Sequence, residues 1–93
     1  MFFEDNWEEV TAKLPTWAHP PKGKGVTQAL RTAVIAELAE QRIVSPDFKP
    51  KAMRSYQALV LKMMEFDPPM AERIVTKVLV GYRRKHSKRY SLD

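Results

Sequence analysis

The residues with the clearest chemical character are cations near the C-terminal end of the sequence. Five permanent positive charges fall within seven residues: Arg83, Arg84, Lys85, Lys88 and Arg89. Such a cluster attracts polyanions, because neutralising phosphate groups releases condensed counterions and gives affinity without shape matching. The sequence therefore predicts a surface that binds the phosphate backbone of a nucleic acid, and it does not separate RNA from DNA.

Other side chains could extend this surface. Tyr82 and Tyr90 flank the cluster and, if exposed, could stack on bases or sugars. Supporting cations are expected at Lys77, Lys51 and Arg54. Two other interpretations of the cluster stay open, because cations also favour the negative end of a helix dipole in a solvated tail and can face an acidic protein partner.

Charge is divided unevenly along the chain. Residues 1–9 hold four acids and no base, residues 49–93 hold eleven bases and four acids, and the whole chain carries a net charge of +5. The start of the last predicted helix, Pro68-Pro69-Met70-Ala71-Glu72, offers no side chain suited to reading bases, and the cations lie at its far end. Backbone contacts are therefore expected rather than sequence-specific recognition.

Patterns typical of catalysis or metal binding are missing from the sequence. It has no Cys, its two His stand far apart, and no His-x-x-x-His or Glu-x-x-His grouping occurs. The serines lack a nucleophile-elbow context, and the segment Lys22-Gly23-Lys24 lacks the spacing of a phosphate-binding P-loop. We expect a non-catalytic regulatory protein without a metal or cofactor.

The two tryptophans support an alternative function. Trp residues are enriched among the energetic anchors of protein interfaces, and Trp17 is followed by the exposed-looking cations Lys22 and Lys24. Together with Trp7 and the five Met, these residues would suit a small inhibitor or adaptor of phage or plasmid type that docks on a protein partner. The sequence leaves the partner and the oligomeric state open.

The spacing of apolar residues predicts four helices, at about 3–14, 26–42, 50–66 and 68–85. The segment 26–42 has the widest apolar face and is expected to be central, with Thr27 as its N-cap. Residues 15–25 are rich in Pro and Gly and are expected to form a loop pinned by Trp17. Asp67 followed by Pro68 marks the start of the last helix.

Length and composition place the chain in one class. Its 93 residues suffice for one small domain, and a hydrophobic share of 44% with a charged share of 29% is typical of globular proteins. We predict an all-α fold over 1–93, a compact bundle of about four short helices with a basic C-terminal extension in which 86–93 could be flexible. The absence of Cys, of a signal-peptide pattern and of a long apolar run predicts a cytoplasmic protein without a membrane segment.

Overall fold

The computed structural model describes residues 11–86. This range contains a short 3-10 helix and three α-helices: η1 (Thr16–Ala18), α3 (Val26–Glu40), α4 (Tyr56–Phe66) and α5 (Pro68–Lys85). No strand occurs between residues 11 and 86, so the predicted all-α class is confirmed there. Most of the helix predicted at 3–14 and the basic extension after residue 86 lie outside the described residues, and the count of four helices therefore stays a prediction.

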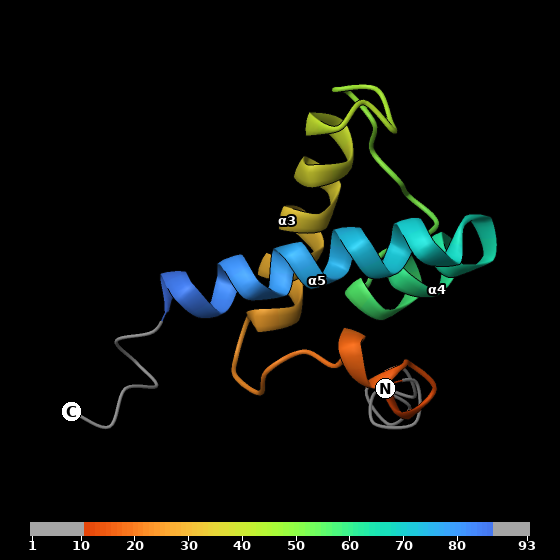
Figure 1. The fold of residues 1–93 in the computed structure, drawn as a ribbon. Helices are drawn as coiled ribbons and strands as arrows, with labels where there is room; N and C mark the ends of the chain where they lie inside the picture. Colours follow the sequence, from red (N-terminus) through yellow and green to blue (C-terminus); the bar gives the residue numbers. More distant parts are fainter. Residues whose placement is uncertain (1–10, 87–93) are drawn as a thin grey trace.

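Helix α5 is the element against which the others pack. It contacts α3, α4 and η1, and Figure 1 shows it crossing the middle of the molecule. Its buried residues come in adjacent pairs that recur every four positions: Met70 and Ala71, Ile74 and Val75, Val78 and Leu79. Such pairs form a broad apolar stripe that can touch several neighbours.

The prediction that the segment 26–42 is central is wrong. Helix α3 buries a single row of residues four positions apart: Val26, Leu30, Val34 and Leu38. Ile35 on its flank is half-buried and Ala36 is exposed. A narrow stripe covers one side of a core, and the small Ala side chains that made the face look wide contribute little to burial.

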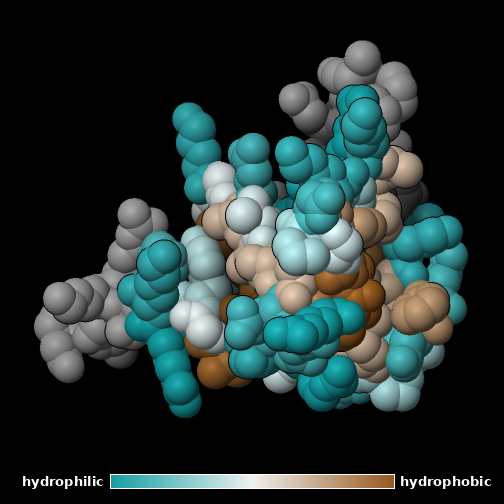
Figure 2. All heavy atoms as spheres, turned by 90° about the horizontal axis from the view of Figure 1, so that it is seen from above, coloured by the Kyte–Doolittle hydropathy of each residue, from teal (hydrophilic) through white to brown (hydrophobic). Residues whose placement is uncertain are grey.

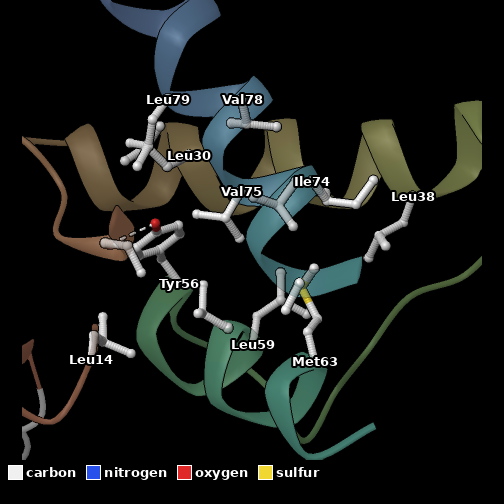
Figure 3. Packing of buried hydrophobic residues seen from close by; sticks show 14 of the residues in the cluster. Leu14, Leu30, Leu38, Tyr56, Leu59, Met63, Ile74, Val75, Val78 and Leu79 are labelled. Carbon is white, nitrogen blue, oxygen red and sulfur yellow. Dashed lines mark hydrogen bonds between the residues drawn. The ribbon is translucent and has the colours of Figure 1, made fainter. Parts of the chain in front are cut away.

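The hydrophobic core lies between the three α-helices and the turn at η1. Figure 3 shows Leu30 from α3, Leu59 and Met63 from α4, and Ile74, Val75 and Leu79 from α5 converging on one another. Leu14 and Ala18 close the core from the N-terminal side. Trp17, expected to pin the loop, is only half-buried, and its neighbour Ala18 is the fully buried residue of η1.

Tyr56 ties the turn at η1 to α4. Its side chain is buried, and its hydroxyl donates a hydrogen bond to the carbonyl oxygen of Ala18 at 2.7 Å, drawn as a dashed line in Figure 3. Burial raises the pKa of the Tyr56 hydroxyl well above its ordinary value, and the positive charge of Arg83 opposes this shift. The hydroxyl therefore stays protonated and keeps donating this bond.

Helix α4 begins at Tyr56, six residues later than the predicted start. Ser55 caps it, since its side chain accepts a hydrogen bond from the backbone N–H of Ala58. The residues before Ser55 are held outside the helix by Arg31 of α3. Its Nε donates to the Met53 carbonyl at 2.8 Å, and its Nη2 donates to the Pro50 carbonyl at 2.9 Å.

The ends of the other helices follow simple local rules. Asp67 ends α4 and begins α5, where its side chain accepts a hydrogen bond from the backbone N–H of Met70. The predicted cap of α3 at Thr27 is wrong, because Gly25 is the N-cap residue and makes no side-chain bond. Gly25 has φ +77°, a left-handed conformation that favours glycine.

Removing the Tyr56 hydroxyl should destabilise the fold measurably. Tyr56→Phe leaves the buried Ala18 carbonyl without this donor, which costs about 1–2 kcal/mol. Urea unfolding followed by circular dichroism measures the loss. Tyr82→Phe is the matched control, because the Tyr82 hydroxyl makes no hydrogen bond within residues 11–86, and a change within about 0.5 kcal/mol is expected. Equal losses in the two variants would contradict a structural role for the Tyr56 bond.

Candidate nucleic-acid interface

The last turn of α5 carries three consecutive exposed cations, Arg83, Arg84 and Lys85, which we call the terminal basic cluster. In Figure 1 the last turns of α5 extend past α3, and hydrophilic side chains project at this end in Figure 2, at the left. The helix ends at Lys85, and the backbone N–H of the C-cap residue His86 donates to the Tyr82 carbonyl at 3.1 Å. Lys88, Arg89 and Tyr90, predicted to extend the surface, lie outside the described residues.

The three cations of the cluster leave the helix in different directions. Consecutive residues of an α-helix are rotated by about 100°, so the three cations span about 200°, a little more than half of the circumference. The cluster therefore spreads around part of the end of α5 rather than forming a row along one face.

Within residues 11–86 the terminal basic cluster has no acidic partner. The ion pairs in this range join Lys62 to Glu65 and Lys77 to Glu37. No side-chain hydrogen bond between the cluster and another residue of this range occurs either, so the cations do not cap the last helical carbonyls there. Within residues 11–86, these three cations are therefore exposed to solvent and paired with no other side chain.

Tyr82 and His86 form an aromatic pair beside the cluster. Their ring centroids are 4.2 Å apart and the rings are tilted by 37°. Both residues are half-buried, and Tyr82 packs against the hydrophobic core, so only part of its ring can receive a stacked base. Sequence reasoning missed the role of His86, although its spacing of four residues from Tyr82 places the two side chains together on a helix.

Lys77 does not join the terminal basic cluster. Its ammonium lies 2.8 Å from a carboxylate oxygen of Glu37 on α3, and its side chain is 63% exposed whereas that of Glu37 is 15% exposed. Hydrogen bonds from Lys77 and from Gln41 hold the pKa of Glu37 below its ordinary value of 4.5. Lys77 therefore carries a charge that an acid of α3 already neutralises.

The Lys77–Glu37 pair should make stability depend on acidic pH. Because the pKa of Glu37 is lower in the folded state, its contribution is complete above pH 4.5 and is lost as the pH falls through the folded-state pKa. Urea unfolding of the wild type and of Glu37→Gln between about pH 7 and pH 3 measures it. The difference between them should be below about 1 kcal/mol at neutral pH and vanish in acid. A difference that grows toward low pH would contradict the pair.

The other predicted cations lie elsewhere. Lys51 is exposed on the loop before α4, next to Arg31 and Ile35 of α3. Arg31 and Glu37 are six residues apart, about 240° around the helix, so Lys51 and Lys77 stand on different flanks of α3. Arg54 is exposed immediately before α4. The structure thus does not bring Lys51 and Lys77 onto one face.

The residues of the alternative interface are only partly available. Trp17 is half-buried against the core, and Trp7 lies outside the described residues. Lys22 and Lys24 are exposed on the loop before α3, where Lys22 borders a shallow cleft with Gln57. Among residues 11–86, the most exposed large apolar residue is one to which sequence reasoning assigned no role: Phe66, at 78% exposure.

Comparisons with known proteins leave the function to be argued from this geometry. No family model matches the chain, and no curated protein or solved structure gives a match. Among residues 11–86, no group of three His, Asp or Glu side chains is placed to hold a metal ion. No helix in the same range is long and apolar enough to cross a membrane.

Proposed function

We propose that the protein binds RNA or DNA without catalysing a reaction, mainly through contacts between the terminal basic cluster and the phosphate backbone. The supporting observation is the run of three consecutive exposed cations that no carboxylate among residues 11–86 neutralises. In sequence, Lys88 and Arg89 continue this run. A regulatory role in RNA or DNA transactions follows from binding without chemistry.

The position of the cluster on α5 favours sequence-tolerant binding. A recognition helix reads base edges mainly with its N-terminal residues, whereas the first turn of α5 begins with Pro68 and Pro69 and is part of the packed body of the protein. The cations lie at the other end and point in several directions. This arrangement suits contacts to phosphates of the backbone, which position a nucleic acid without reading its sequence.

The test is an equilibrium titration of labelled single-stranded RNA, duplex RNA and duplex DNA. Measurements at about 50 mM and about 200 mM salt cover the range over which phosphate-dominated binding weakens steeply. We expect the logarithm of the affinity to fall linearly with the logarithm of the salt concentration, with a slope of about −0.9 per neutralised phosphate on duplex DNA. Absence of binding to all three at about 50 mM salt would refute the proposal.

The salt dependence of binding distinguishes nucleic-acid binding from the alternative function. A small inhibitor or adaptor anchored by apolar side chains would bind a protein with little dependence on salt, because burial of apolar surface is not screened by ions. Its predicted anchor Trp17 has only part of its surface available. Nucleic-acid binding through the terminal basic cluster is therefore the function that we favour.

A further inference from the structure

An apolar groove lies far from the terminal basic cluster, where the C-terminal ends of α3 and α4 meet the start of α5. Its volume is about 430 Å³. The lining is mainly large apolar side chains from α3, the loop after it, α4 and α5: Leu38, Ile43, Val44, Phe48, Met53, Leu59, Met63, Phe66 and Met70. Hydrophobic atoms are open to view right of the centre of Figure 2, on the side where Figure 1 places the junction of α4 and α5.

Phe66 stands out from the edge of this groove. It is the last residue of α4, and the chain turns at Asp67 directly into α5, which leaves the Phe66 side chain 78% exposed. Isolated apolar residues on a surface are ordinary. Phe66 instead borders the groove, so a protruding aromatic ring and a hollow that could receive one lie on the same face.

The charges at the groove are balanced. From the described part of the chain, the charged residues that line it are Lys62 and Glu65, one turn apart on α4, and their charged atoms lie 3.5 Å from each other. Both side chains are mostly exposed, 65% and 71% respectively, so the pair contributes little to stability within the chain. A rim with one charge of each sign does not select a strongly acidic or basic partner.

Such a rim is complementary to itself. About a two-fold axis, the same patch of two chains meets, and residue i of one chain contacts residue j of the other while j contacts i. Lys62 of each chain can then face Glu65 of the other. Phe66 of each chain can likewise enter the groove of its partner, so the charge pattern and the shape favour the same occupant.

We propose that this groove is the interface of a two-fold symmetric homodimer, in which Phe66 of each chain inserts into the groove of the other and Lys62 pairs with Glu65 across the interface. The net charge of +5 opposes association, but the terminal basic cluster is more than a dozen residues along α5 from Met70, or about 20 Å. Each terminal basic cluster therefore lies away from the groove itself. The inference does not rest on the proposed nucleic-acid binding.

Sedimentation equilibrium of the full chain without nucleic acid tests the dimer. Between about 1 and about 200 µM, the wild type should shift from monomer to dimer, as mass action requires. Phe66→Ser should raise the dimer dissociation constant at least about tenfold and leave thermal unfolding of the monomer unchanged, since the side chain is exposed. A wild type that is monomeric at every concentration, or a Phe66→Ser dimer as strong as the wild type, would overturn the proposal.

Charge exchange tests the two-fold arrangement itself. K62E alone or E65K alone places like charges opposite each other in the dimer and should weaken it roughly threefold to tenfold. The double variant K62E/E65K restores opposite charges across the axis and should return the dissociation constant close to that of the wild type. Failure of the double variant to recover dimerisation refutes the arrangement. Lys49→Glu, an equal charge change at an exposed residue outside the groove lining, is the control and should leave dimerisation unaltered.

Discussion

Replacing Arg83, Arg84 and Lys85 together by alanine should lower the affinity for RNA or DNA on the order of 100-fold at about 100 mM salt. Each of these cations is exposed and unpaired with any acid among residues 11–86, so each can neutralise a phosphate at little cost of desolvation. Loss of three such contacts should also reduce the salt dependence, with a slope smaller by about 3. Fluorescence anisotropy titrations over a range of salt concentrations measure both quantities.

A charge-matched variant separates a local contact from a general effect of net charge. Lys13, Lys24 and Lys49 are exposed and lie outside both the terminal basic cluster and the groove, and their joint replacement by alanine removes the same three charges. This control should weaken binding less than about tenfold, because exposed charges beyond a Debye length are largely screened. If the control loses as much affinity as the cluster variant, binding depends on net charge and not on the end of α5. Thermal unfolding of both variants verifies that the fold persists.

Truncating Ile74 should cost about 3–4 kcal/mol of unfolding free energy, the largest effect on stability that we predict. Ile74 is fully buried in the middle of α5, the helix that α3, α4 and η1 all contact. Ile74→Ala leaves a cavity bordered by several elements, and such a cavity closes poorly. Because small domains are stable by only about 5–15 kcal/mol, the loss is a large share of the total, and urea unfolding should show a clearly lower midpoint than in the wild type.

A milder variant at the same position and a control variant on the same helix accompany Ile74→Ala. Ile74→Val removes one methylene and should cost about 1 kcal/mol, which leaves a well-defined unfolding transition. Val80→Ala changes a residue of the same helix that is 43% exposed and should cost no more than about 0.5 kcal/mol. A loss in Ile74→Ala no larger than that in Val80→Ala would contradict the central position of α5 in the core.

The parts of the fold that could be predicted depend on local signals. Asp67 followed by Pro68 marks the start of α5 without reference to any other segment, and the paired apolar residues along α5 predict its buried face. The start of α4 could not be predicted in this way. Arg31 lies some twenty residues before the segment it binds, and its hydrogen bonds to the Pro50 and Met53 carbonyls hold that segment outside the helix.

The candidate site likewise has features that local sequence predicts and features that depend on contacts between distant segments. The exposure of Arg83, Arg84 and Lys85 follows from their place at the end of a helix whose buried stripe stops before them. The neutralisation of Lys77 depends on Glu37, forty residues away, and only the packing of α3 against α5 shows it. The exposure of Phe66 depends on the direction in which the chain leaves α4, which residue spacing does not specify.

Because Asp67 is at once the last cap of α4 and the first cap of α5, no linker separates the two helices. The groove beside Phe66 and the cations at the far end of α5 are then joined by one stiff arm of about 20 Å. In a homodimer formed through the groove, two such arms would present their cationic ends at a fixed separation. A nucleic acid long enough to reach both ends would gain avidity from the high effective concentration of the second end, whereas a shorter one would bind as to a monomer. The affinity of the dimer would thus depend on the length of the nucleic acid.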